Sequence, residues 1–522
     1  MLVGDKMIVL KRRSNMLKIN TITITLLMAS IVGFAQTEQN RYNVLFIMSD
    51  DLNTDIGPYG NNTVKTPNLD RLAENGITFR NAYVQFPLCA PSRASLLTGL
   101  RPDSVKIYDL NTPIRKRLPD VVTLPQLFKN NGYQTVRVGK IFHYHVPRHI
   151  GTDGLDDTLS WNLRFNPRGR DWYAIDSNIT PTPGYAAYNP DGVDYEIDEL
   201  VQIGPRRLTL DYLADGGADA EQTDGIIAHT AVEQLERFHQ SKEPFFLAVG
   251  FFRPHFPSIA PKKYFDQYGL NEVGLAPHAE NDMEDIPEAA LFTNPPGWGL
   301  TDQQAMEARR GYYASISFMD AQVGRVLDAL ERLGLAENTI VVFLSDHGYN
   351  LGEHGQWLKQ SLFEKSAKAP LIISVPNGLK DTSSNRIVEY IDVFPTVVEL
   401  ANLQKPAKVQ GKSLIPLLEN PSSNWSYPAF TQVQRRVSLA ADSDSGKSHV
   451  QSTWGRSGKQ IMGRSIRTEQ WRYTEWGEGE YGLELYNHQE DPNEFTNLAS
   501  DPKHSQTITK LKKLLNENYT NR

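Results

Sequence analysis

The chain of 522 residues contains a single cysteine, Cys89. One thiol cannot form an internal disulfide, so Cys89 is either an ordinary buried residue or a reactive one. The cysteine count alone favours the ordinary interpretation, because free cysteines are among the most buried residue types. The chain also lacks an excess of positive charge, since its formal net charge is −7. We therefore expect no nucleic-acid partner, although a local cluster of Lys, Arg and His can still bind a small anion.

Long apolar runs are absent after the first 35 residues, so we expect no membrane span in the mature chain. Near the N-terminus, basic residues between Lys11 and Lys18 precede an apolar stretch over residues 21–34 that ends in small residues. This order is typical of a secretory signal, and the stretch is shorter than the roughly 20 residues that a spanning helix needs. We predict a signal peptide over residues 1–35, starting at Met1 or Met16, and export to the periplasm or the medium.

The overall composition, 40% hydrophobic and 22% charged, is ordinary for a globular protein. Short apolar runs rich in β-branched residues predict buried parallel strands at residues 43–48, 135–138, 245–249, 339–344 and 371–375. Helical patterns lie between them, at residues 68–75 and from about 303 to 333. This alternation predicts an α/β fold with a mostly parallel sheet flanked by helices.

One region has little periodicity, and another marks a change of domain. Residues 151–217, rich in Asp, Gly, Pro and aromatics, predict a long loop region over one sheet edge, where specificity often resides. The composition shifts near residue 420, and short apolar segments then lead to a closing helical pattern at 503–518. We expect a catalytic domain over residues 36–425 and a smaller C-terminal α+β subdomain with an antiparallel sheet over residues 426–522.

Two of the predicted strands end in acidic residues. Asp50 and Asp51 follow the first strand, and Asp346 and His347 follow the fourth. Ligands gather at the carboxyl ends of strands in open α/β sheets, and oxygen donors there suit Ca²⁺ or Mg²⁺. The alternative is that each aspartate only caps a following helix or turn. A matching pair on two strands favours a metal site, in which His347 is unusual because nitrogen rarely binds calcium.

The segment around Cys89 changes the interpretation of this residue. It reads Cys-Ala-Pro-Ser-Arg from Cys89 to Arg93 and ends in Thr98-Gly99. This pattern resembles the maturation signature of type I sulfatases in the alkaline phosphatase superfamily. The segments at residues 139–143, 250–255 and 351–359 are most similar to the iduronate-2-sulfatase branch. The resemblance implies an alkaline-phosphatase-like fold and a sulfuric ester hydrolase, and the signal is typical of a bacterial polysaccharide-degrading member.

The resemblance also implies a nucleophile and a metal site. A maturation enzyme would oxidise Cys89 to formylglycine, the residue that attacks the sulfur atom. One Ca²⁺ would be held by the formylglycine oxygen together with the residues at the two strand ends, namely Asp50, Asp51, Asp346 and His347.

The same resemblance assigns five cationic or titratable side chains to catalysis. Arg93 and Lys140 would stabilise the nucleophile, and His143 would accept the proton whose loss expels sulfate. His255 and Lys359 would contact the sulfate, and one of them would protonate the leaving oxygen. Taken singly, each would more often be a solvated charge or a satisfied polar residue.

Two other functions are compatible with the fold class. A phosphomonoesterase or phosphodiesterase of the superfamily usually places Ser or Thr between two metals, whereas this chain offers a cysteine and one metal site. A non-catalytic sulfated-glycan binder would have lost the nucleophile or the cations, yet all are present. We therefore expect a substrate that is a sulfated oligo- or polysaccharide. Glycosaminoglycans and algal polymers such as ulvan both fit, and a 2-O-sulfated uronic acid is the unit that this branch suggests.

Overall fold

The computed structural model describes residues 41–178, 210–293, 295–441, 448–451 and 458–520. The chain divides into two compact units, residues 1–41 and 42–522. The fold described below is that of the second unit, and the predicted signal peptide at residues 1–35 lies outside the described ranges. Within those ranges, no helix combines the length and the hydropathy that crossing a membrane requires.

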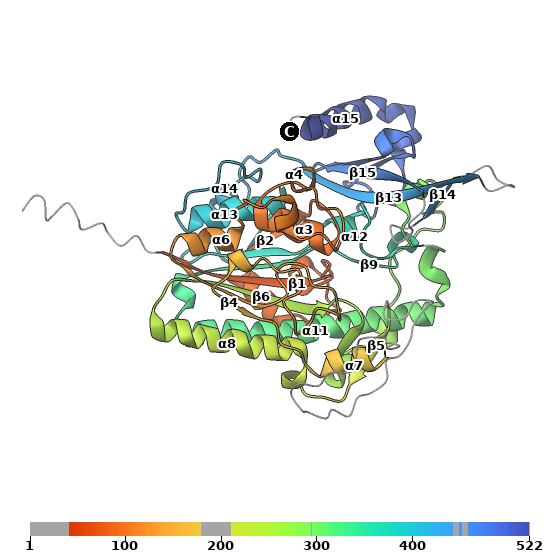
Figure 1. Ribbon diagram of the computed structural model, residues 1–522. Helices are drawn as coiled ribbons and strands as arrows, with labels where there is room; N and C mark the ends of the chain where they lie inside the picture. The colour runs from red at the N-terminus through yellow and green to blue at the C-terminus, as the bar shows by residue number, and fades with distance from the viewer. Residues whose placement is uncertain (1–40, 179–209, 294, 442–447, 452–457, 521–522) are drawn as a thin grey trace, which may run out of the picture. The chain divides into compact units, whose positions relative to one another are not determined.

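A mixed, mostly parallel sheet forms the centre of the unit (Figure 1). Among the described residues it contains eight strands in the order β12-β2-β11-β8-β1-β6-β3-β4. Their bounds are β1 Asn43–Asp50, β2 Ile77–Tyr83, β3 Gln134–Gly139, β4 Leu163–Phe165, β6 Phe245–Pro254, β8 Thr339–Ser345, β11 Leu371–Ser374 and β12 Thr382–Glu389. The predicted α/β architecture is therefore confirmed, and β1 lies between β8 and β6, parallel to both.

Strand β11 corrects one prediction. We expected a parallel strand at residues 371–375, but β11 pairs antiparallel with both β8 and β2. A parallel strand would need a crossover, usually a helix, that carries the chain back to the end of the sheet at which β8 begins. The connection from β8 instead contains the short hairpin of β9 Asn350–Leu351 and β10 Trp357–Leu358 and the helix α12 Glu364–Ala367. The chain thus re-enters the sheet from the edge at which β8 ends.

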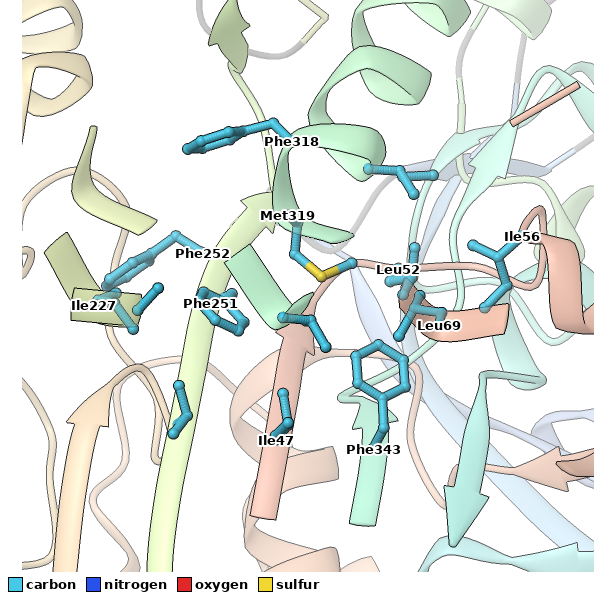
Figure 2. Close-up of a cluster of buried hydrophobic side chains, with 14 of the residues drawn as sticks. Ile47, Leu52, Ile56, Leu69, Ile227, Phe251, Phe252, Phe318, Met319 and Phe343 are labelled. Atoms are coloured by element: carbon cyan, nitrogen blue, oxygen red, sulfur yellow. The ribbon is translucent and has the colours of Figure 1, made fainter. Parts of the chain in front are cut away.

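Helices cover both faces of the sheet, and each face has its own apolar core. On β1 the alternating side chains divide between them, with Leu45 and Ile47 in one cluster and Val44, Phe46 and Met48 in the other. Figure 2 shows part of the first cluster, in which side chains of the sheet pack with those of α11. Burying each such side chain stabilises the fold by roughly 1.5–3 kcal/mol.

The helices vary widely in length. The longest are α8 Thr223–Ser241 and α11 Asp302–Arg332, which pack on each other. The predicted helices at 68–75 and 303–333 correspond to α2 and α11. The other described helices are α2 Pro67–Glu74, α3 Cys89–Thr98, α4 Pro102–Val105, α5 Ile114–Arg117, α6 Leu124–Asn130, α7 Arg170–Asn178, α9 Lys262–Phe265, α10 Leu270–Val273, α13 Val393–Leu400, α14 Ile415–Glu419 and α15 Ser505–Thr520.

The region predicted as one long loop, residues 151–217, contains regular structure and so corrects that prediction. It includes β4, the helix α7 and the strand β5 Tyr212–Asp215, which pairs with β7 Ser258–Pro261; residues 179–209 lie outside the described ranges. These elements are too short to give a periodic apolar pattern. They are fixed instead by polar contacts, such as those of the buried Asp171 with Thr223 and Arg253.

The C-terminal part forms an antiparallel sheet with one packed helix, as expected. Its strands run in the order β14-β13-β15-β16-β17, with bounds β13 Ala429–Ala441, β14 Ser448–Gln451, β15 Lys459–Arg467, β16 Trp471–Trp476 and β17 Leu483–Asn487. Leu511 and Leu515 of α15 belong to one apolar cluster on this sheet. Val433 and Val437 of β13 belong to another, which includes Leu88. The residue before Cys89 is therefore packed in the same core as the C-terminal sheet.

Candidate active site

The predicted site residues meet at the carboxyl ends of four neighbouring strands. Asp50 is the last residue of β1, Asp346 follows β8, Lys140 follows β3 and His255 follows β6. All four side chains are buried. A parallel sheet brings such strand ends to one edge, so residues far apart in sequence share a single cluster.

Asp51 occupies a turn that most residues avoid. The register between β1 and β6 shifts after Met48, and Asp51 has a φ of 65°, in the left-handed region. Tyr312 of α11 donates a hydrogen bond to the Asp51 carbonyl at 2.6 Å, and the Asp51 amide donates to Asp346 Oδ1 at 3.0 Å. The surrounding structure therefore fixes a strained conformation, a common feature of functional sites. It holds the Asp51 carboxylate near the Cys89 thiol.

Cys89 is the first residue of α3. Its side chain is 1% exposed. The Sγ atom lies 3.1 Å from Lys359 Nζ, 3.4 Å from His347 Nε2 and 3.8 Å from Asp51 Oδ1. Burial raises the pKa of the Cys89 thiol far above its usual value, although the nearby Lys359 opposes the shift. The thiol is thus a weak nucleophile as it stands, which accords with a need for chemical conversion.

Arg93, one turn further along α3, binds the acidic residues at two strand ends. Its Nη2 donates to Asp50 Oδ1 at 3.0 Å and its Nε donates to Asp346 Oδ2 at 2.9 Å. Its Nη1 donates to the carbonyl oxygens of Lys140 and Ile141 at 2.8 and 2.9 Å. Arg93 is 1% exposed. These hydrogen bonds of its guanidinium group all go to other groups of the protein, so Arg93 holds the cluster together as well as supplying charge.

Lys140 reaches the other oxygen of Asp50. Its ammonium group donates to Asp50 Oδ2, and its backbone amide donates to the Gly250 carbonyl at 2.8 Å. This approach of β3 to β6 requires glycine: a Cβ on Gly139, whose φ is +78°, would lie 2.0 Å from the Gly250 oxygen. Burial alone would raise the pKa of Asp50, but the positive charges of Lys140 and Arg93 hold this pKa well below its usual value.

The two predicted catalytic histidines have different surroundings. His143 is 7% exposed, and neither ring nitrogen has a hydrogen-bond partner among the described residues. Burial and the nearby Lys140 lower the pKa of His143 well below its usual value, so the ring is neutral at pH 7. His255 Nδ1 lies 2.7 Å from the Phe256 carbonyl and Nε2 lies 3.7 Å from Asp51 Oδ2. Burial lowers the pKa of His255 to about 3, although Asp51 opposes this shift.

Lys359 completes the cluster from the connection between β10 and α12. Its Nζ donates to both oxygens of Asp51, at 2.6 and 2.8 Å. Burial would lower the pKa of Lys359, but the negative charge of Asp51 outweighs it and raises this pKa well above its usual value. Its neighbours Leu358 and Gln360 both have positive φ, at 71° and 70°. The conformation that presents Lys359 is therefore strained and needs external support.

Arg435 of the C-terminal sheet supplies part of that support, and no motif in the sequence predicts this role. Its Nη2 donates to the Gln360 carbonyl, and the guanidinium lies over the rings of Phe292 and Trp476, 5.4 and 5.2 Å from their centroids. Among the described residues Arg435 forms no ion pair, although the charge of Glu484 acts on it and opposes the effect of burial. Burial lowers the pKa of Arg435 to about 9. Burying a cation without a paired acid costs free energy of folding. We therefore expect Arg435 to have a structural role beside Lys359.

Replacing Arg435 by Met tests whether Arg435 supports the conformation that presents Lys359. The apolar side chain keeps most of the volume and removes an unpaired buried charge, so we expect stability to change by less than about 2 kcal/mol. The Gln360 carbonyl loses its donor, however, and we expect kcat to fall about 10-fold because Lys359 is held less firmly. Thermal unfolding and steady-state kinetics measure the two effects. A variant with an unchanged kcat would show that Lys359 does not depend on Arg435.

The cluster can accommodate a metal ion. Asp51, Cys89, Asp346 and His347 each offer one ligand atom, and these atoms lie within 4.8 Å of one another. His347 Nδ1 lies 2.9 Å from the Gly348 carbonyl; with the proton assigned to Nδ1, the lone pair of Nε2 points into the cluster. Asp50 is outside this group, because Arg93 and Lys140 bind both of its oxygens.

The charges of the cluster also fit a cation together with an anionic substrate. Three carboxylates are matched by three cations, namely Asp50, Asp51 and Asp346 by Arg93, Lys140 and Lys359. A divalent ion would therefore leave a net positive charge in a buried site. Such a charge favours the binding of an anion, whose own charge would offset it.

A second group of possible ligands, Glu364, His488 and Glu494, lies between α12 and the C-terminal sheet. Arg472 already donates to both glutamates, and His488 Nε2 lies 2.8 Å from Glu494. This group is an ion-pair network that joins the C-terminal sheet to α12. Protein donors occupy its acidic oxygens, and it contains no cysteine.

Comparisons with known proteins agree with this geometry. The sulfatase family model matches residues 42–403. A sulfatase of Formosa agariphila is 34% identical over 497 residues, covering 92% of this chain and 87% of that protein. The iduronate 2-sulfatase of Homo sapiens is 33% identical over 509 residues, covering 85% and 86%.

Solved structures share the fold at lower identity. A 2-O GAG sulfatase superimposes with a TM-score of 0.65 at 23% identity, covering 92% of each chain. A phosphonate monoester hydrolase of Agrobacterium radiobacter superimposes with a TM-score of 0.71, also at 23% identity, covering 92% of this chain and 96% of that one. The fold therefore accommodates more than one ester chemistry.

The chain has the alkaline-phosphatase-like fold of the solved sulfatase structures, with a buried cluster of ionisable residues at its strand ends. The extent of the family match shows that the chain belongs to the sulfatase family, and it is a sulfuric ester hydrolase.

Proposed function

We propose that this enzyme removes sulfate from a sulfated carbohydrate, with a formylglycine made from Cys89 as nucleophile and one bound Ca²⁺. The observation that carries the proposal is the position of Cys89 Sγ, within 3.8 Å of Lys359, His347 and Asp51 in a buried cluster. The relative from Homo sapiens is named for iduronate, which supports a sulfated uronic acid as the reacting unit. Glycosaminoglycans and algal polymers such as ulvan both carry such units.

The metal and the modified residue each contribute one kind of chemistry. Bound Ca²⁺ would be held by Asp51, Asp346 and His347. Asp50 would join them on giving up its bond to Lys140 or Arg93, and the ion would neutralise charge on the sulfate. Formylglycine, as its hydrate, would supply the oxygen that attacks sulfur and so divide one difficult displacement into two steps. A separate maturation enzyme would carry out the oxidation, because the buried thiol has no oxidant among the described residues.

The remaining side chains bind charge and move protons. Lys359, 3.1 Å from Cys89 Sγ, places a permanent positive charge where the sulfate must lie. Arg93 and Lys140 hold Asp50 and add positive charge behind the nucleophile. His143, neutral and without a partner in the described part of the chain, is suited to accept the proton whose removal expels sulfate.

His255 is the better candidate for the acid that protonates the leaving oxygen. Lys359 is held firmly protonated by Asp51 and so gives up its proton reluctantly. The Nε2 atom of His255 points toward Asp51 because Nδ1 is bound to the Phe256 carbonyl. The pKa of about 3 belongs to the site without substrate, and the negative charge of a bound sulfate ester would raise it.

Replacing His255 by Ala tests the proton-donating role. A sugar alkoxide is a poor leaving group, so we expect kcat/KM for a sulfated sugar to fall roughly 10²–10⁴-fold. An aryl sulfate has a better leaving group and should be affected much less. The two substrates are assayed in parallel, with Lys359→Ala as the companion variant. Equal losses on both substrates in both variants would make these residues sulfate binders only.

The substrate class is tested by measuring sulfate release from size-defined oligosaccharides. The panel contains sulfated glycosaminoglycan and ulvan fragments, with phosphonate and phosphate monoesters as controls. We expect turnover of at least one sulfated uronic acid fragment and slower turnover of the controls. Faster hydrolysis of a phosphonate or phosphate ester than of every sulfated sugar would contradict the proposal.

A further inference from the structure

A cavity of about 500 Å³ opens beside the catalytic cluster. This volume lies within the range of roughly 300–1,000 Å³ that is usual for small-molecule sites. Three of its lining residues are joined to the cluster. Leu88 precedes Cys89, Gln360 follows Lys359, and the ring of His145 lies 4.7 Å from that of His143. The cavity therefore borders the segments that carry Cys89, Lys359 and His143.

The C-terminal sheet forms the opposite wall. Arg435 and Arg436 of β13 line the cavity, and Gln460 of β15 stands opposite Arg436 in the strand register. Gln460 Nε2 donates to Gln434 Oε1 at 2.6 Å. The cavity wall also includes Phe86 and Tyr108, whose ring centroids are 6.2 Å apart, and the polar residues Asp109 and Asn111. Aromatic rings with amide groups are suited to a ring that is apolar on its faces and hydroxylated at its edge.

The charge of the cavity is positive. The carboxylate of Asp109 accepts hydrogen bonds from the amides of Asn111 and Thr112 and from the Thr112 hydroxyl, so its oxygens are engaged within its own turn. Arg435 is buried and bound to the Gln360 carbonyl. Arg436 is only partly buried, and the one hydrogen bond that its side chain makes among the described residues is a contact of 3.5 Å to the Gly458 carbonyl. Arg436 is thus the guanidinium with donors left for a ligand.

We infer that this cavity binds the sugar that carries the reacting sulfate, and that Arg436 pairs with a second anionic group on it. The inference rests on the proposed function, because only a sulfated substrate would be drawn to Cys89. A uronate carboxylate and a second sulfate share the chemistry that Arg436 recognises, two oxygens that accept parallel N–H bonds. The C-terminal sheet thereby selects doubly anionic sugars, whereas the central sheet carries the chemistry.

Equilibrium binding to the full chain with Cys89→Ala tests the inference without turnover. The probes are a disaccharide with one sulfate and one uronate, and its carboxyl-reduced counterpart. Calorimetry gives the ratio of the two dissociation constants, first for the protein with Arg436 and then for the protein that also carries Arg436→Gln. A charge-assisted pair contributes about 1.5–3 kcal/mol, so we expect the preference for the uronate form to fall about 10-fold or more. A second pair of probes, one disaccharide with a single sulfate and one with two sulfates, identifies which anion Arg436 binds.

Lys459→Gln is the matched control, because Lys459 is an exposed cation of β15 paired with Glu480. It removes the same charge from the same sheet and should leave the preference unchanged. Gln460→Glu places an acid opposite Arg436 and should lower the preference even if Arg436→Gln does not fold. An unchanged preference with both probe pairs in Arg436→Gln and Gln460→Glu would overturn the inference. Failure of the unsubstituted enzyme to release sulfate from any probe would instead overturn the proposed function.

Discussion

Replacing Cys89 by Ala is expected to reduce sulfate-ester hydrolysis by roughly 10⁴-fold or more, the usual cost of losing a covalent nucleophile. The fold should persist, because the substitution removes only one sulfur atom from a buried position at the start of α3. Lys359 and His347 would keep their partners in Asp51, so binding of the sulfated substrate should survive. Steady-state kinetics and equilibrium binding on the same preparation measure the two properties.

Ser95→Ala is the control for this variant. Ser95 lies on the same helix, is fully buried, and its hydroxyl has no hydrogen-bond partner among the described residues. The substitution also removes one heavy atom from α3 and should leave activity close to that of the unsubstituted enzyme. If Cys89→Ala retained more than a tenth of the activity, the nucleophile would have to be another group.

Removing the bound metal is expected to lower kcat/KM by at least about 100-fold, because the metal provides several kcal/mol of charge stabilisation. The protein should remain folded, since three carboxylates in the cluster are balanced by three cations of the chain. Adding Ca²⁺ back should restore activity and raise Tm, with about 2.7 kcal/mol of stabilisation at a hundredfold excess over Kd.

Chelation followed by elemental analysis, thermal unfolding and kinetics tests this expectation. Asp346→Asn is the companion variant: it keeps the shape of the side chain but removes a charge that Arg93 needs. We expect this variant to lose metal affinity and stability together, because it leaves a buried guanidinium with a single carboxylate. Normal turnover by a metal-free preparation would contradict the metal assignment. A second metal at full occupancy would favour the phosphatase mechanism.

The sequence was most informative where chemistry is local. The pattern from Cys89 to Arg93 is contiguous, and Asp50 and Asp346 each follow an apolar run that could be read as a strand. Because parallel strands end at one edge, their meeting could be predicted without a structure. The structure adds that Asp50 is engaged by Arg93 and Lys140 rather than lying in the group of possible ligands.

Features that depend on distant packing could not be predicted. The direction of β11 follows from the path of the connection after β8, which carries no apolar period of its own. Arg435 and Arg436 sit in a strand more than 300 residues from Cys89 along the chain, and alternate residues of that strand face different surroundings. Both arginines line the cavity, and nothing in the local sequence distinguishes Arg435, which is bound to the Gln360 carbonyl, from Arg436. Only the tertiary structure shows this difference.

Mass spectrometry of the peptide that contains residue 89, prepared from active enzyme, tests the central claim most directly. The account predicts formylglycine at this position, in a fraction of the molecules that rises and falls with specific activity across preparations. Full activity in enzyme whose residue 89 is entirely unmodified cysteine would contradict it.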